Sequence, residues 1–403
     1  MYGAQLIEAL RLEFPGAGSA DEPRRTGALT HPEEVSSANA GVCRGLEFFG
    51  VGGDNMRAAG CDIVVDARDL AVVGITEILS HLPKIWRLFH RLIEEADRKQ
   101  PDLAIVIDSP AFNWRVAREM KKRGIPVVYY VCPQFWAWRQ GRVKLLRKYV
   151  DKALVIFPFE EKFYRDRGVD AEFVGHPLAE LGRPSVTREA YAAKYGLVAS
   201  KPWITLMPGS RAKEVRMNLP EMLRATELLG PDYNFLIPVA PTISKSLILD
   251  QMKALDPDTP PIHLVPEALP ALAHSRAGII ASGTATVEAA MMETPFVMVY
   301  RVTPITYLLG RSAVKVPYFA MVNLIAGDRV VPELVQQDFT AEAIIKELNR
   351  VLVDGPERER MLDGLRKVRR SLVGTEGARW KAASRAAKAI AAMKFESPSA
   401  VRA

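Results

Sequence analysis

The stretch that decides the fold is WITLMPGSRAKEV, residues 203–215. It begins with a largely apolar run that is typical of a strand buried on both faces, and helical character starts after its glycine turn. Further apolar runs alternate with helical segments on its C-terminal side, at 233–239, 262–265, 277–282 and 295–300. This alternation predicts a parallel sheet in an α/β domain.

The same alternation fills the N-terminal half of the chain. Apolar runs lie at 46–53, 103–108, 127–131, 153–157 and 172–175. We therefore predict an α/β fold of two doubly wound Rossmann-like domains, with ligands bound in a cleft at the carboxyl ends of the strands. The expected parts are an N-terminal domain (1–177) with a mobile loop (15–45), a C-terminal domain (178–372), and a helix (373–403) that packs back on the body and ends in a frayed tail.

Composition and charge narrow the class of protein. The 403 residues carry 54 Lys and Arg against 47 Asp and Glu, a net charge of +7, which favours an anionic partner. No basic block or nucleic-acid-binding motif occurs, so nucleic acid is not an expected partner. Cys43, Cys61 and Cys132 form no CxxC pair, which argues against a zinc site and favours the cytoplasm. The sequence contains no run of about 18 apolar residues, so we expect no membrane-spanning helix.

One loop in the C-terminal half has the character of a phosphate site. It is PGSR, Pro208 to Arg211, and it directly follows an apolar run. Gly209 allows close backbone approach, Ser210 and its neighbours present N–H groups, and the Arg211 guanidinium matches phosphate oxygens. The alternative is an ordinary turn that carries a surface arginine.

A second loop, ASGTATVE at 281–288, also follows an apolar run and opens a helix. Glu288 can accept hydrogen bonds from a ribose diol, although a first-turn carboxylate favoured by the helix dipole is its commoner role. Small residues leave room for a ligand against the backbone at Ser282, Gly283, Thr284 and Ala285. Two such loops in one domain predict a site for a nucleotide diphosphate.

Two segments of the N-terminal half carry further candidate residues. Asp108, in IDSPAFN (107–113), ends an apolar run and is expected to be partly buried in the cleft as a general base. Its alternative role is an N-cap for the helix after Pro110. The loop CPQFWAWRQGR (132–142) holds aromatic residues that either pack inside or line a sugar or acyl site.

Residues 75–93 have the pattern of an amphipathic helix with basic residues between its apolar ones. We expect Leu82, Trp86 and Phe89 to contact an anionic membrane surface that delivers acylated substrate. A core helix, started or kinked by Pro83, is the competing interpretation.

Taken together, these motifs resemble those of a known family, lipid-A-disaccharide synthase. The resemblance covers about residues 46–340 and rests on motifs that are specific in combination. These motifs are FFGVGGDNM (48–56), IDSPAFN, WAWRQGR (136–142), PFEEKFY (158–164), FVGHPL (173–178), PGSRAKEV (208–215), ASGTATVE and NLIAGDRVVPEL (323–334). It implies the GT-B fold and a glycosyltransferase that joins UDP-2,3-diacylglucosamine to 2,3-diacylglucosamine 1-phosphate and releases UDP, with neither metal nor cofactor.

The resemblance also assigns roles to single residues. The family's essential Asp falls on Asp108, the Arg of its PGSR motif on Arg211 and the Asn of its NLxAG motif on Asn323. Glu214, just after the PGSR loop, is a further expected UDP-sugar contact. The sequence departs from the family at Ala111, where a second Asp is usual. It also opens directly on a helix, YGAQLIEAL, without the family's preceding strand and GExSGD loop, so we expect the chain as given to lack its true start.

The implied reaction is an inverting displacement in which Asp108 takes the proton of the acceptor 6-hydroxyl and Arg211 holds the departing diphosphate. A cytoplasmic protein at the inner membrane surface, with the option of a homo-oligomer, fits these substrates. Two alternatives stay open. One is a non-hydrolysing UDP-sugar 2-epimerase, and the other is a non-catalytic nucleotide-sugar binder, motivated by the missing loop.

Overall fold

A computed structural model describes most of the chain. The described residues are 2–14, 45–70, 75–180, 182–253, 255–256, 259–304, 307, 316–373 and 381–393, without the side chains of 75–82. The loop expected at 15–45 therefore lies outside the described residues except for Gly45, and so does the end of the chain beyond 393.

The C-terminal half is built on a six-stranded parallel sheet with the order β12-β11-β10-β7-β8-β9. Its strands are β7 (Trp203–Met207), β8 (Asn234–Pro238), β9 (Ile262–Val265), β10 (Ala277–Ala281), β11 (Phe296–Tyr300) and β12 (Glu333–Val335). The chain builds outward from β7 on one side and then returns to β10 on its other side. The carboxyl ends of β7 and β10 consequently lie next to each other at the point where the strand order reverses, with Met207 opposite Ile280.

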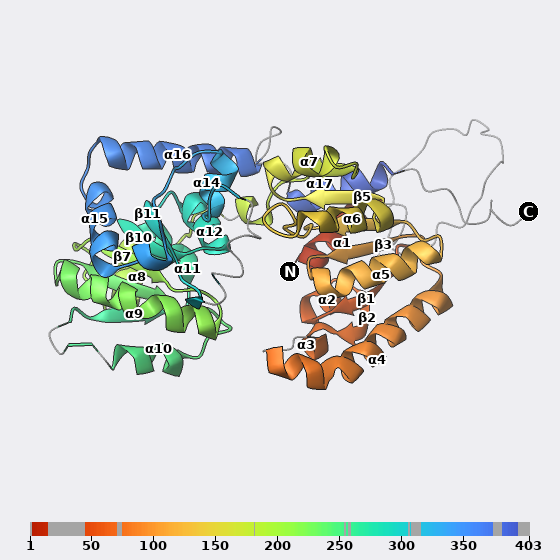
Figure 1. Cartoon of the computed structure of the whole chain (residues 1–403), viewed down its shortest axis with the longest axis horizontal. Helices are drawn as coiled ribbons and strands as arrows, with labels where there is room; N and C mark the ends of the chain where they lie inside the picture. Colours follow the sequence, from red (N-terminus) through yellow and green to blue (C-terminus); the bar gives the residue numbers. More distant parts are fainter. Residues whose placement is uncertain are drawn as a thin grey trace, which may run out of the picture.

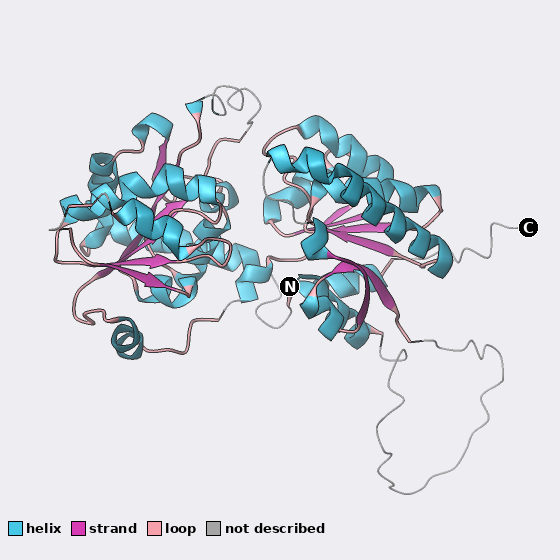
Figure 2. Cartoon of the chain, turned by 90° about the horizontal axis from the view of Figure 1, so that it is seen from below, coloured by secondary structure: helices cyan, strands magenta, loops and turns pink. Residues whose placement is uncertain are grey.

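Helices cover both faces of this sheet, as Figure 2 shows. They are α8 (Arg188–Tyr195), α9 (Ala212–Leu229), α10 (Lys245–Met252), α11 (Ala268–His274), α12 (Thr284–Met292), α14 (Met321–Ala326), α15 (Ala341–Leu352) and α16 (Pro356–Val373). Residues of β8 and β10 are buried throughout, as expected for strands covered on both sides.

The N-terminal half has a four-stranded parallel sheet, β3-β4-β5-β6, and a separate two-stranded parallel sheet, β1-β2. The strands are β1 (Phe48–Gly52), β2 (Cys61–Asp66), β3 (Ala104–Ile107), β4 (Val127–Tyr130), β5 (Lys152–Val155) and β6 (Ala171–Phe173). The helices are α1 (Tyr2–Glu13), α2 (Asp54–Ala58), α3 (Ala67–Leu70), α4 (Ile75–Lys99), α5 (Pro110–Lys122), α6 (Val143–Tyr149) and α7 (Pro158–Arg165). β1 and β3 line a cavity of about 810 Å³ between the two sheets.

The last described helix, α17 (Ala382–Ala391), returns to the N-terminal half (Figure 1). Its alanine-rich face is buried, and it packs on α1. Two hydrogen bonds fix it there: the Arg385 guanidinium donates to the carbonyl of Val174 at 2.6 Å, and the Ala382 N–H donates to Glu180 at 2.5 Å. The chain thus crosses between the two halves twice, once near the 3₁₀ turn Pro177–Glu180 and once after α16.

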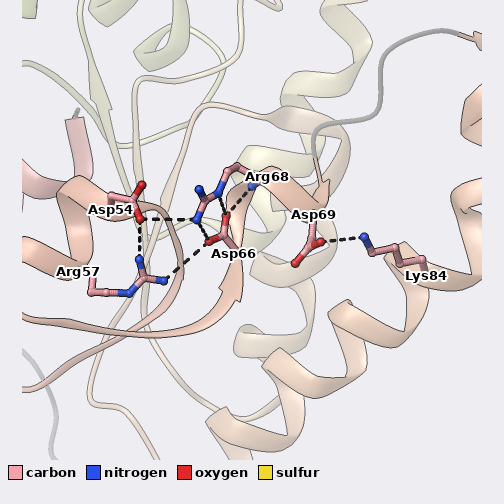
Figure 3. Close-up of polar contacts among 6 residues, drawn as sticks. All are labelled: Asp54, Arg57, Asp66, Arg68, Asp69 and Lys84. Carbon is pink, nitrogen blue, oxygen red and sulfur yellow. Dashed lines mark hydrogen bonds and ion pairs between the residues drawn. The ribbon is translucent and has the colours of Figure 1, made fainter.

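Ion pairs join α2, β2, α3 and α4 at one end of the N-terminal half (Figure 3). Arg68 pairs with Asp66 at 2.8 Å, and its hydrogen bonds hold the pKa of Asp66 well below its usual range. Lys84 pairs with Asp69 at 2.8 Å and so ties α4 to α3. Pro83 lies inside α4, which is therefore neither started nor ended by it.

Candidate active site

The PGSR loop after β7 is shaped by one carboxylate. Glu214 accepts hydrogen bonds from the N–H groups of Ser210 at 3.0 Å and Arg211 at 3.2 Å, and its other oxygen pairs with the Arg211 guanidinium at 2.6 Å. Gly209 has φ +125°, and a Cβ there would lie 2.6 Å from Glu214, so only glycine fits. The N–H groups of this loop, which we expected to bind a ligand, are thus partly occupied by hydrogen bonds to Glu214. The Arg211 side chain is 80% exposed.

The loop after β10 lies beside the PGSR loop because β7 and β10 are neighbours. Gly283 has φ +143° and open space around its Cβ position, and Thr284 and Ala285 begin α12. Ser282 donates a hydrogen bond to the carbonyl of Phe319 at 2.8 Å, which anchors the segment before α14. Burial raises the pKa of Glu288, one turn further along α12.

These two loops open into a cavity of about 1000 Å³. Every residue that the sequence assigned to them lines it: Pro208, Gly209, Ser210, Arg211, Glu214, Ser282, Gly283, Thr284, Ala285 and Glu288. The opposite wall comes from the N-terminal half and includes Trp136 and Phe157. The cavity therefore lies between the two halves, at the carboxyl ends of β7 and β10.

The aromatic loop 132–142 contributes to this wall in two ways. Phe135 and Trp136 are buried, with Trp136 packed edge-on against Phe159 at 4.9 Å between ring centroids. Trp138 is 47% exposed and lies under the Arg139 guanidinium. Trp136 is thus both packed inside the protein and part of the cavity wall.

Asp108 follows β3 in a strained conformation, with φ +49° and a following Ser109 at φ +43°. Its carbonyl accepts hydrogen bonds from the Tyr129 hydroxyl at 2.7 Å and from Asn113 at 2.6 Å, so the main chain is fixed. Its carboxylate is exposed, not partly buried as expected, and Ser109, not Asp108, holds the N-cap position of α5.

Tyr2 feels carboxylates from both halves of the chain. Burial raises the pKa of the Tyr2 hydroxyl, and the carboxylates of Asp108 and Glu288 raise it further. Asp108 itself is not among the residues that line the cavity, whereas Glu288 is.

Comparison with known proteins decides the family. The model of the lipid-A-disaccharide synthetase family matches residues 30–389. The chain belongs to this family. It is 48% identical to a lipid-A-disaccharide synthase of Koribacter versatilis over 390 residues, which are 97% of this chain and 94% of that one. It is 45% identical to the synthase of Acidobacterium capsulatum over 89% of this chain and 91% of that one.

The likeness to solved structures agrees on the fold. The glycosyltransferase of kitacinnamycin superposes with a TM-score of 0.58 at 14% identity, covering 97% of this chain and 96% of that one. The GT-B fold expected from the motifs is thereby confirmed. Membership of the lipid-A-disaccharide synthetase family favours a glycosyltransferase over the epimerase and the non-catalytic binder.

One residue that the synthetase resemblance assigned to UDP-sugar contact has a different position. Asn323 is fully buried and does not line the cavity. Its amide accepts from the N–H groups of Val330 and Val331 and donates to the carbonyl of Val331 and to Glu333, all at 2.9 Å. The direct contact is therefore wrong for this structure, because all of these polar atoms are used internally.

Glu333 is a residue of this chain that sequence analysis missed. Besides Asn323, its carboxylate accepts hydrogen bonds from the N–H groups of Phe319 and Ala320, at 2.8 to 3.1 Å. Phe319, Met321 and Leu324 line the cavity. Asn323 and Glu333 thus support the cavity wall from behind.

The expected membrane helix also needs correction. Phe89 is 7% exposed and packs edge-on against Phe112 at 5.9 Å, so it belongs to the core of the N-terminal half. Trp86 is 59% exposed. The side chain of Leu82 lies outside the described residues. The apolar stripe of α4 turns inward along its second half, as the core-helix interpretation has it.

In the described part of the chain, no group of three or more His, Cys, Asp and Glu side chains could hold a metal ion. No helix there is long and apolar enough to cross a membrane.

Proposed function

We propose that this chain joins UDP-2,3-diacylglucosamine to 2,3-diacylglucosamine 1-phosphate to form lipid A disaccharide 1-phosphate and UDP. The observation that supports this most is the pair of glycine loops after β7 and β10, which open into one cavity that faces the N-terminal half. In this proposal residues 178–372 bind the UDP-sugar, residues 1–177 bind the acceptor, and the segment from 373 returns to the first part.

In the proposed reaction Asp108 takes the proton of the acceptor 6-hydroxyl. The oxygen then forms a bond to the anomeric carbon while the bond from that carbon to the UDP oxygen breaks. Arg211 and the N–H groups that begin α9 hold the departing diphosphate, and Glu288 accepts from the ribose. The exposed carboxylate of Asp108 on a fixed main chain suits a base that must reach an incoming hydroxyl.

The test is to supply both lipid precursors and measure UDP and disaccharide. Asp108→Asn should lower the rate by roughly two to four orders of magnitude while UDP still binds, because it removes the base with little change of shape. Asp102→Asn, at an exposed position before β3, is the matched control and should keep full activity. Near-full turnover by Asp108→Asn would assign the base to another residue.

We further propose that the protein works in the cytoplasm at the anionic surface of the inner membrane, without nucleic acid as a partner and with a homo-oligomer as an open option. Trp86 supports the membrane contact, since it is 59% exposed and Arg87 and Arg91 beside it are also exposed. Aromatic and basic side chains together favour an anionic interface. Lys84 contributes little to the attraction for an anionic surface, because its charge is paired with Asp69.

Trp86→Ser should release the protein from vesicles that contain anionic phospholipid and leave its unfolding temperature unchanged. Trp138→Ser is the matched control, since it removes another exposed tryptophan from a different loop. Equal vesicle binding by wild type and Trp86→Ser would refute this contact.

A further inference from the structure

Glu160 is a fully buried carboxylate that the proposed reaction does not use. It lies in the first turn of α7, immediately behind the cavity wall. One carboxylate oxygen accepts a hydrogen bond from the indole N–H of Trp136 at 2.8 Å. The other accepts from the N–H groups of Ile156 at 3.1 Å and Phe157 at 3.0 Å.

The bonds of Glu160 join two segments that are distant in sequence. Trp136 belongs to the loop after β4, and Phe157 belongs to the turn after β5. Both residues line the cavity opposite the nucleotide loops. Phe159 completes the packing, edge-on to Trp136 and stacked on Phe157 at 5.8 Å. The positions of both rings therefore depend on the same carboxylate.

The charge of Glu160 has no nearby cation among the described residues. The titratable groups that face it are the Cys132 thiol and the Tyr164 hydroxyl, both uncharged, and burial raises the pKa of each. Tyr164 donates its own hydrogen bond to the carbonyl of Pro133. Burial raises the pKa of Glu160 to about 7, despite the three donors that favour its ionised form.

We propose that Glu160 is a positioning residue for acceptor binding, whose carboxylate holds Trp136 and the turn at Ile156 and Phe157 together as one wall of the cavity. The proposal rests on the proposed function in one respect: the acceptor binds on the side of the N-terminal half. Glu160 does not touch substrate, and it acts through the two aromatic residues.

The geometry predicts what happens when Glu160 gains a proton. The oxygen that faces Ile156 and Phe157 meets two N–H donors and cannot carry a hydrogen there. The proton must reside on the oxygen that faces Trp136, on the lone pair that the indole N–H does not use, so the indole then donates to a neutral hydroxyl oxygen. Protonation therefore weakens the hold on Trp136, and the acceptor KM should rise as the pH falls through about 7.

Glu160→Gln removes the charge at every pH and disturbs Trp136 more than protonation does. Its carbonyl oxygen must face the two backbone donors, so its NH₂ group, which cannot accept a hydrogen bond, faces the indole N–H of Trp136. We expect the acceptor KM to rise about tenfold at pH 8, as for a lost hydrogen bond to a charged group, with kcat and UDP affinity within about twofold. The rise of KM below pH 7 should disappear in this variant.

Trp136→Phe removes the indole N–H and supplies the decisive comparison. In the double variant Glu160→Gln with Trp136→Phe no donors oppose each other, so its KM should be lower than that of Glu160→Gln alone. Glu161→Gln is the matched control, because Glu161 is the next residue of the helix and pairs with Arg165 at 2.8 Å. It should leave KM and its pH profile unchanged.

Acceptor binding is also measured directly, without UDP-sugar, by calorimetry on the wild type and each variant. An unchanged KM in Glu160→Gln, additive effects in the double variant, or an equal loss of UDP affinity and acceptor affinity would overturn the proposal. A wild type that binds acceptor but releases no UDP would instead count against the proposed function. The two failures are thus distinguishable.

Discussion

Replacement of Gly209 by alanine tests how the PGSR loop is built. The residue has φ +125°, a conformation that side chains rarely adopt, and its new Cβ would lie 2.6 Å from both Cβ and Oε2 of Glu214. The carboxylate can swing aside, but the Cβ of Glu214 is fixed to α9. Either the loop or the start of the helix must therefore move.

The magnitude follows from these two terms. The backbone conformation costs about 1–3 kcal/mol for a residue other than glycine. Forcing a methyl group into filled space costs about 1–3 kcal/mol more. We therefore expect Gly209→Ala to lower the free energy of unfolding by roughly 2–6 kcal/mol. It should also weaken UDP binding, because the displaced loop moves the N–H groups of Ser210 and Arg211 away from their present position beside the cavity.

Gly196→Ala is the matched control. Gly196 ends α8 with φ +68°, and nothing lies within 4 Å of its Cβ position. It should lose only about 1–2 kcal/mol, the cost of the left-handed conformation, and keep its UDP affinity. Urea unfolding and UDP calorimetry of the two variants make the comparison. Equal losses of stability together with unchanged UDP binding in Gly209→Ala would refute the steric argument.

Three further predictions follow from the same structure. Arg211→Ala should weaken the binding free energy of UDP by about 1.5–3 kcal/mol, measured by calorimetry. A metal chelator should not change the activity of the wild type. Asn323→Ala should lower the free energy of unfolding in urea by about 3 kcal/mol, because it leaves the N–H groups of the half-buried Val330 and the buried Val331 without an acceptor. Burial lowers the pKa of His176 to about 4, so stability should fall by up to about 3 kcal/mol between pH 6.5 and 4, where the unfolded chain takes the proton; His176→Asn should flatten that profile.

Most strands were predictable because the strands of a parallel sheet that is buried on both faces are continuous apolar runs in the sequence. Two strands were missed. β2 carries Asp62 and Asp66 and lies at a sheet edge, so its apolar run is short and broken. β12 has three residues, and its pairing with β11 depends on a tertiary contact that no local pattern records.

The two glycine loops that line the cavity were predictable because each is continuous in sequence and follows a strand directly. Asn323 was not, since its partners are fixed by how the segment 330–333 folds back on it. The prediction that Phe89 contacts a membrane was wrong for another reason. A helix face that packs on a core and one that packs on a membrane have the same sequence period. Glu160 was quoted in a motif, but only the fold shows that its carboxylate joins Trp136 to Phe157.

The charges in the cavity explain why a diphosphate, if bound as proposed, would need both glycine loops. Among the described residues that line it, Arg211 is the one cation, and Glu214 and Glu288 are carboxylates. Arg211 is already paired with Glu214, so a diphosphate gains the guanidinium only by exchange with that pair. Burial raises the pKa of Glu288, which favours its neutral form and lessens its repulsion of an anion. The remaining attraction must come from backbone N–H groups, and adjacent strands place the N-termini of α9 and α12 on the same cavity.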